Sequence, residues 1–345
     1  MAANQQIVDF LQHYLDEAKK NPYEAAAVTM VGKTGVPYGG HGGHITMQYL
    51  LLEAITNIGG QLRQSMENWM LPPRNPVLDA SYFVYSMLTC PLGFDFLVWL
   101  INAEMTRKRF KADGPLKVCF WEGRNPDGIP QREARQNYLN NIFRPLLKMF
   151  GGVEVADPHG WYKESYVVKD VVQAARDGEE VPKFIPSKKS LFPGYITITL
   201  READHWSERN SRLNDWYQFG RYLEGVGEKV VVVRDTSKAF ESFRGLKTCP
   251  EASVNLEDRL ALYDEAKMNF FVSNGPVSLA VFSDAPWMQF VTIDPKEAED
   301  FWQKTAGMSF GEQYPWAKQN QRIIWKPDTY ENLVAAWDSK LVSAA

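Results

Sequence analysis

Almost wholly apolar runs alternate with amphipathic segments along the chain from residue 77 onward. Runs such as 229–233 and 270–272 are typical of buried parallel strands. Between such runs, apolar residues recur at a helical spacing, as Leu97, Ile101 and Met105 do. Strands that alternate with helices in this way predict parallel sheets joined by right-handed crossovers.

The alternation predicts an α/β protein with two Rossmann-like domains and an extra N-terminal helical segment. Residues 1–76 form this N-terminal extension, which ends in a proline-rich stretch. We expect the first Rossmann-like domain at 77–189, the second at 190–327, and a C-terminal helix at 328–345.

The stretch 262–291 carries the strongest local signal, because its pattern predicts a helix, a strand, a tight turn, a helix and a strand in succession. Its turn is the sequence Ser273-Asn274-Gly275-Pro276, at the carboxyl end of the strand and the amino end of the second helix. Open α/β sheets bind ligands at such turns, where free backbone N–H groups and the helix dipole favour an anion such as a diphosphate. An ordinary strand-to-helix turn without a ligand is the alternative.

Composition narrows the classes of function. The chain of 345 residues has a formal net charge of -4 and no long basic run, so binding to nucleic acid by general electrostatics is not expected. Its 3 cysteines are far apart, which argues against a disulfide framework or a zinc site and indicates a reducing compartment. Residues 1–20 read as an amphipathic helix, neither a signal peptide nor an integral membrane segment. We therefore expect a cytoplasmic protein, with peripheral membrane contact left open.

Residues 32–44 are rich in glycine and histidine. Glycine lets the backbone approach a ligand closely, so we expect this segment to contact an acceptor substrate, with a surface loop as the alternative. The glycines concerned are Gly39, Gly40, Gly42 and Gly43. A metal site is not expected, because His41 and His44 have no carboxylate nearby.

Polar and basic residues follow the predicted strands of the second domain and should converge on one rim of its sheet. Arginine offers a planar fork for phosphate oxygens, and Asp235 could accept hydrogen bonds from a ribose or a base. The candidates for nucleotide or diphosphate binding are Arg201, Arg209, Asn210, Asp235, Ser237, Lys238, Ser273, Asn274, Gly275, Pro276 and Ser278. Surface ion pairs with neighbouring acids are the alternative for Arg201 and Arg209.

The second domain resembles the donor-binding domain of GT-B-type glycosyltransferases, in particular the fucosyltransferase and heptosyltransferase branches. The resemblance rests on a strand followed by LRE, RN at a helix start, a second strand with an RDTSK loop, and LYDEAKMNFFVSNGPVSLAVFSDAP. It implies that Arg201 contacts the diphosphate, although Thr199 stands where the family pattern His-x-Arg has its histidine. It also implies that the last helix, 328–340, crosses back to the first domain. The first domain shares the resemblance only at the level of fold.

The resemblance implies transfer of a sugar from a nucleoside-diphosphate sugar to a glycan or to a protein- or lipid-linked acceptor, as in polysaccharide biosynthesis. Basic side chains and helix N-termini stabilise the leaving diphosphate in such sites, so neither a cofactor nor a metal is expected. An inverting enzyme also needs a general base. Candidates for the base are Asp95, His41, His44 and His205. For Asp95 the alternative is a carboxylate that only stabilises a helix start, and for the histidines it is loop exposure. A nucleotide-sugar epimerase on the same scaffold and a non-catalytic nucleotide- or glycan-binding module are the alternative functions.

Overall fold

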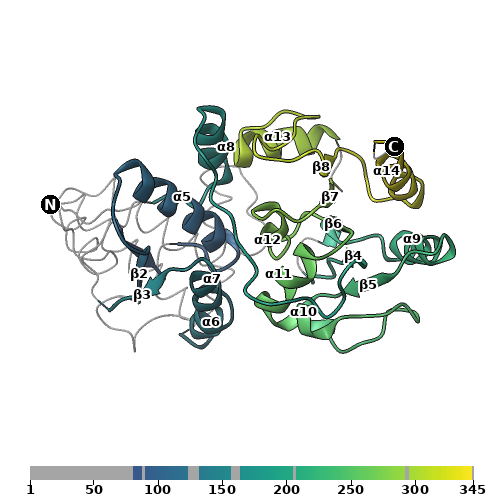
Figure 1. Cartoon of the computed structure of the whole chain (residues 1–345), viewed down its shortest axis with the longest axis horizontal. Helices are drawn as coiled ribbons and strands as arrows, with labels where there is room; N and C mark the ends of the chain where they lie inside the picture. The colour runs from purple at the N-terminus through teal and green to yellow at the C-terminus, as the bar shows by residue number, and fades with distance from the viewer. Residues whose placement is uncertain are drawn as a thin grey trace, which may run out of the picture.

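The computed structural model contains two parallel sheets, one in each half of the molecule (Figure 1). It describes residues 81–87, 90–122, 132–156, 164–204, 207–291 and 295–343. The strand order is β1-β2-β3 in the first sheet and β5-β4-β6-β7-β8 in the second, and every pairing is parallel. The predicted α/β class with two Rossmann-like parts is therefore confirmed, whereas the predicted N-terminal helical segment, 1–76, lies outside the described residues.

The first half alternates strands and helices around an aromatic core. Its elements are β1 (Tyr82–Ser86), α5 (Asp95–Arg109), β2 (Lys117–Trp121), α6 (Arg132–Tyr138), the π-helical turn η2 (Leu139–Phe143), α7 (Arg144–Met149), β3 (Val153–Glu154) and α8 (Val168–Arg176). Tyr85 of β1 packs edge-on against Trp99 of α5, with ring centroids 5.1 Å apart. The core therefore fixes the start of α5 near the carboxyl end of β1.

The second half has a sheet whose inner strands are wholly buried. Its elements are β4 (Ile196–Thr199), η3 (Ser207–Arg209), α9 (Leu213–Gly225), β5 (Val230–Val233), η4 (Thr236–Lys238), α10 (Pro250–Val254), α11 (Leu256–Asp264), β6 (Met268–Val272), α12 (Ser278–Val281), β7 (Trp287–Phe290), α13 (Pro295–Ala306), β8 (Gln321–Ile324) and α14 (Tyr330–Ser343). Every residue of β4 to β7 is buried, as the continuous apolar runs predict.

The two halves share one continuous apolar cluster. It includes Phe96 and Trp99 of α5 together with Phe271 of β6 and Leu279 of α12. The segment that joins the halves is also tied to the second one, because the backbone N–H of Phe184 donates to the carbonyl of Phe282 at 2.8 Å. The carboxyl ends of the strands in the two sheets are consequently fixed relative to each other.

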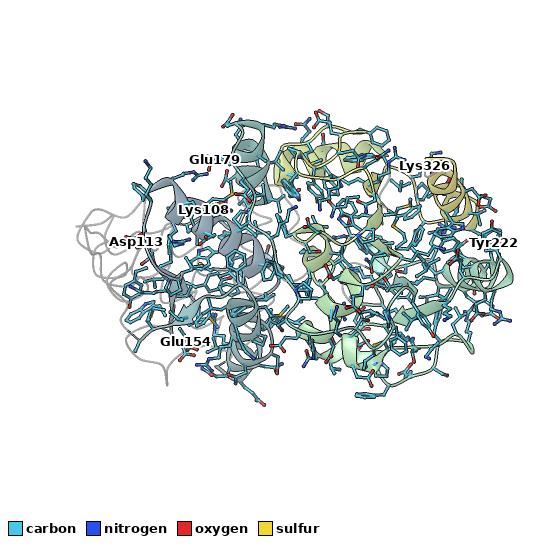
Figure 2. The ribbon with its side chains drawn as sticks, in the orientation of Figure 1. Lys108, Asp113, Glu154, Glu179, Tyr222 and Lys326 are labelled. Carbon is cyan, nitrogen blue, oxygen red and sulfur yellow. The ribbon has the colours of Figure 1, made fainter. Side chains whose placement is uncertain are left out.

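The last helix, α14, does not cross back to the first half, so this prediction for 328–345 is wrong. α14 packs on α9, where the Tyr222 hydroxyl donates to Asp338 at 3.1 Å. Figure 2 shows Tyr222 at the end of the molecule that is far from Lys108 of α5. The reason is that the apolar face of α14, which includes Trp337, joins the cluster formed by Trp216 of α9. It is α13 that packs against α8 of the first half (Figure 1).

No helix in the described ranges is both long and apolar enough to cross a bilayer.

Candidate functional site

The candidate site lies at the carboxyl ends of three neighbouring strands of the second sheet. In the order β5-β4-β6 the chain passes from β4 to one neighbour and then to the other. This reversal makes the gap between the ends of β4 and β6 a topological switch point, the place where open parallel sheets bind ligands. Arg201 follows β4, Asp235 follows β5 and Ser273 follows β6, so the structure brings the three predicted segments to one rim.

Arg201 is held in place by its own neighbourhood. Its side chain is only 5% exposed, and its backbone N–H donates to the hydroxyl of Ser211 at 2.9 Å. The guanidinium donates to the amide oxygen of Asn210. Asn210 also bonds both backbone groups of Ala203, at 3.1 and 2.8 Å. The Asn210 side chain therefore supports Arg201 directly, and its own contact with a nucleotide stays a prediction.

Arg209 lies close enough to Arg201 for the two charges to repel each other. Burial lowers the pKa of Arg209, and the charge of Arg201 lowers that pKa further. Burial also lowers the pKa of Arg201, against the opposing effect of Asp235 and Glu208. Two partly desolvated cations side by side form a place where a bound anion would be stabilised.

The turn after β6 closes the site. The Arg209 guanidinium donates to the carbonyl of Ser273 at 3.4 Å, and the side chain of Asn274 accepts from the N–H of Val277 at 3.1 Å. The sequence predicts a helix starting at Pro276, but α12 has only 4 residues. Because one helical turn has little macrodipole, attraction of an anion depends on the two arginines and not on a helix dipole. We call Arg201, Arg209 and the turn 273–276 the switch-point site.

Gly275 connects the switch-point site with the first half. A Cβ atom at Gly275 would lie 2.8 Å from Cδ2 of Phe94, the residue immediately before α5. The turn after β6 therefore touches the start of α5 directly, and only glycine leaves room for this contact. Asp95, the exposed first residue of α5, is next to this contact. Burial raises the pKa of Tyr85 first of all, and the charges of Cys90 and Asp95 raise it further.

A buried ion pair that we did not predict lies beside the site. Glu202 accepts two hydrogen bonds from Arg234, at 2.9 and 2.6 Å, and these bonds raise the pKa of the arginine. Lys238 lies 3.7 Å from the same carboxylate, and Asp235 accepts from the backbone N–H of Glu202. Asp235 and Lys238 thus surround Glu202, whereas Ser237 is exposed. The sequence could have indicated this ion pair, because opposite charges that directly follow adjacent parallel strands are well placed to pair.

The remaining candidates fall into two groups. Pro276 and Ser278 flank the start of α12, and the N–H of Ser278 donates to the carbonyl of Gly275 at 3.1 Å. Outside the described residues lie His41, His44, His205, Gly39, Gly40, Gly42 and Gly43. Within the described parts of the chain, no three His, Cys, Asp or Glu side chains come together as metal ligands would.

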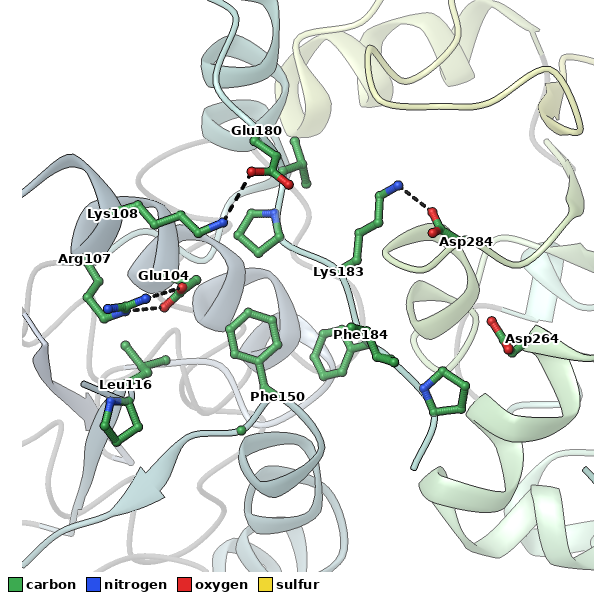
Figure 3. Close-up of a pocket in the computed structure, with 16 residues that line it drawn as sticks. Glu104, Arg107, Lys108, Leu116, Phe150, Glu180, Lys183, Phe184, Asp264 and Asp284 are labelled. Atoms are coloured by element: carbon green, nitrogen blue, oxygen red, sulfur yellow. Dashed lines mark hydrogen bonds and ion pairs between the residues drawn. The ribbon is translucent and has the colours of Figure 1, made fainter. Parts of the chain in front are cut away.

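A cavity of about 570 Å³ lies between the halves at the opposite rim, near the amino ends of the strands (Figure 3). It is lined by the end of α5, the joining segment 180–186 and the residues that precede β6 and β7. Lys108 lies 3.7 Å from Glu180 across it, and Lys183 pairs with Asp284. Because its main charges pair with one another, we place the chemistry at the switch-point site.

Comparisons with known proteins find similarity in structure only, since no family model and no curated protein match the sequence. The chain is similar to the iron-containing dodecameric glycosyltransferase TibC from enterotoxigenic E. coli H10407, with 16% identity, 61% of this chain and 57% of that chain covered, and a TM-score of 0.39. For E. coli heptosyltransferase WaaC with ADP-2-deoxy-2-fluoro heptose, identity is 15%, coverage 73% and 71%, and TM-score 0.30. The chain is also similar to Methanocaldococcus jannaschii UDP-GlcNAc 2-epimerase in complex with UDP-GlcNAc and UDP. Identity there is 13%, 88% of this chain and 75% of that chain are covered, and the TM-score is 0.30.

The chain thus spans less than two thirds of the TibC structure. Heptosyltransferases, which the sequence resembles in its second domain, are among these similar structures. With TM-scores of 0.30–0.39, these similarities do not indicate a function, and the geometry of the switch-point site has to supply it.

Proposed function

We propose that this chain is a GT-B-type glycosyltransferase that takes a sugar from a nucleoside-diphosphate sugar. The observation that carries the proposal is the pair of partly buried arginines, Arg201 and Arg209, at the switch point between β4 and β6. A diphosphate would neutralise both charges and accept the directional N–H groups of two guanidinium forks. The acceptor would be a glycan or a protein- or lipid-linked sugar, and the reaction would take place in the cytoplasm.

The leaving group sets the chemistry that the switch-point site must perform. As the bond between the anomeric carbon and the β-phosphate oxygen breaks, negative charge grows on the diphosphate. Fixed cations in a place with little water stabilise that charge more than they stabilise the bound donor, which lowers the barrier. Arg201 and Arg209 would do so without a metal ion.

The acceptor would be activated from the first half. Its hydroxyl oxygen forms the new bond to the anomeric carbon, and its proton passes to a general base. We assign this role to Asp95, because the contact between Phe94 and Gly275 places the start of α5 against the turn of the switch-point site. His41, His44 and His205 stay predictions for the same role, and an acceptor contact of the glycine segment 39–43 also stays a prediction.

A nucleotide- or glycan-binding module without turnover is the second candidate, favoured by Thr199. In the family pattern a histidine precedes the arginine at this position. Here the Thr199 hydroxyl lies 2.9 Å from the hydroxyl of Tyr263, inside the core. This position therefore supplies no acid or base to the site.

Product analysis tests the proposal. The purified chain is incubated with UDP-, GDP-, ADP- and CMP-sugars, each with and without a panel of glycan acceptors and with EDTA present. We expect a glycosylated acceptor and one equivalent of free nucleoside diphosphate with one donor class. Conversion of the donor without any acceptor would instead show an epimerase, and binding without turnover on the whole panel would show a binding module.

A further inference from the structure

Gln289 is a polar side chain in the middle of an apolar strand. It lies in β7 between Met288 and Phe290, and its side chain is only 4% exposed. Its amide nitrogen donates to the hydroxyl of Ser273 at 2.6 Å. Its amide oxygen is buried and accepts no hydrogen bond from the residues that the structure describes. A buried acceptor left unpaired costs folding free energy, so this glutamine needs a reason other than stability.

A second buried glutamine shows what a purely structural role looks like. Gln321 of β8 donates to the carbonyls of Ser283 and Ala285, at 3.0 and 2.8 Å. Its amide oxygen accepts from the N–H of Lys318 at 3.0 Å. The amide of Gln321 is therefore fully used in holding backbone, whereas that of Gln289 makes one contact, to a residue of the switch-point site.

The hydrogen bond from Gln289 fixes what the Ser273 hydroxyl can do. A serine hydroxyl has one proton to donate and two lone pairs to accept with. The N–H of Gln289 occupies a lone pair and cannot accept, so the Ser273 proton must be given to another group. The carbonyl of Ser273 already accepts from Arg209. Ser273 therefore lies beside the charge of Arg209, and the hydrogen bond from Gln289 leaves its hydroxyl proton to be donated elsewhere.

We propose that Gln289 is a positioning residue that makes the Ser273 hydroxyl a hydrogen-bond donor to a phosphate oxygen of the nucleoside diphosphate. The inference rests on the proposed function and adds to it a neutral donor, the hydroxyl of the residue whose carbonyl accepts from Arg209. It also gives a role to the buried amide of Gln289, whose oxygen accepts no hydrogen bond from the described residues. Replacing the Gln289 side chain should leave the stability of the fold unchanged or raise it, and should weaken binding of the diphosphate.

Calorimetric titration with nucleoside diphosphates and with the matching nucleosides tests the inference. We expect Gln289→Met to bind the diphosphate roughly tenfold more weakly, the loss of one hydrogen bond to a charged group, with unchanged nucleoside affinity and an unchanged or higher melting temperature. Gln289→Glu should lose at least as much, because a carboxylate only accepts and turns the serine proton inward. Ser273→Ala should match Gln289→Met, and tests the same bond if that variant does not fold.

Gln321→Met is the matched control, expected to lower the melting temperature without changing diphosphate affinity. Wild-type affinity in Gln289→Met, Gln289→Glu or Ser273→Ala would overturn the inference while leaving the proposed function in place. If the wild-type chain binds no nucleoside diphosphate, the proposed function fails and this inference fails with it.

Discussion

At the scale of single residues, Arg201 and Arg209 are two cations that the fold holds together in a partly buried place. Desolvation of a charge is costly unless the charge is paired and hydrogen-bonded. Asn210 and Ser211 hold Arg201, and the carbonyl of Ser273 accepts from Arg209. Burial and the charge of Arg201 nevertheless lower the pKa of Arg209, against the opposing effect of Glu208. Such an arrangement reduces stability in the free protein and favours binding of an anion.

We therefore predict opposite effects of Arg209→Met on stability and on binding. Diphosphate affinity should fall at least tenfold, because a charge-assisted hydrogen bond contributes roughly 1.5–3 kcal/mol. The free energy of unfolding should stay the same or rise, because the cost of burying the Arg209 charge and its repulsion by Arg201 are both removed. Titration calorimetry and urea unfolding measure the two quantities.

Arg221→Met is the control for Arg209→Met. Arg221 lies on the exposed face of α9 and pairs with Glu224 at 2.5 Å, so its loss should change stability by about 0.5 kcal/mol at most and leave binding unchanged. Equal diphosphate affinity in wild type and Arg209→Met would contradict the assignment of Arg209.

Asp95→Asn should separate donor binding from turnover. If Asp95 is the base, turnover should fall roughly 100-fold or more while donor affinity stays within a factor of two, because the carboxylate acts on the acceptor proton. Asp170→Asn is the control, since Asp170 is likewise an acid in the first turn of a helix, α8. Equal effects of the two substitutions would show that Asp95 only stabilises its helix start.

At the scale of elements, the sequence predicted the strands well because their apolar runs are continuous. It predicted helix lengths less well. The segment after Pro276 reads as a longer helix, but β-branched Val277 and Val281 and the breaker Pro286 leave α12 one turn long. No local pattern marks the π-helical turn at Leu139–Phe143, which separates α6 from α7.

The rim residues were predictable, because the carboxyl ends of parallel strands meet at one edge. The sequence could not show which of these rim residues hold other residues in place, because that depends on tertiary packing. Asn210 turns toward Arg201 and Ala203, and Asp235 toward Glu202. The docking of α14 on α9 also depends on packing, here between Trp337 and the cluster of Trp216.

Asp328, which lies between α9 and α14, should make the free energy of unfolding depend on pH. One carboxylate oxygen accepts from the N–H of Arg212 at 2.9 Å and from the indole N–H of Trp216 at 2.6 Å. Burial raises the pKa of Asp328, more than these bonds lower it. The folded protein thus keeps a proton that the unfolded chain has released. The contribution of Asp328 to stability is full below the ordinary carboxyl pKa and declines as pH rises to the raised value.

Asp328→Asn should remove this dependence, because an amide oxygen keeps both accepted bonds and does not titrate. The stability of the variant relative to wild type should increase as pH rises from about 4 to 7. Urea unfolding followed by tryptophan fluorescence measures the difference. A constant difference between Asp328→Asn and wild type over this range would contradict the account.

At the scale of the whole molecule, the two halves meet where the proposed reaction takes place. The shared apolar cluster and the contact between Gly275 and Phe94 bring the start of α5 against the switch-point site. This contact could not be predicted from the sequence, because it joins residues far apart in the chain through the packing of two sheets.

Gly275→Ala should disturb this junction. Its methyl group would lie 2.8 Å from Cδ2 of Phe94, so Phe94 or the turn must move. We expect turnover to fall more than donor affinity, because the shift separates Asp95 from the donor. The double variant Gly275→Ala/Phe94→Ala should recover part of the turnover, since the obstructing ring is gone. Gly225→Ala is the control, with no atom within 4 Å of its added methyl. A double variant no better than the single one would argue against the junction.

The proposed function requires the switch-point site to bind a nucleoside diphosphate without a metal. The most direct test is a thermal-shift titration of the wild-type chain with UDP, GDP, ADP and their sugars, with and without EDTA. At a hundredfold excess over its dissociation constant, a ligand stabilises the folded state by roughly 2.7 kcal/mol, which is readily seen. We predict a saturable shift with one diphosphate class that EDTA leaves unchanged. The absence of a shift with every nucleotide, or a shift that EDTA abolishes, would contradict the account.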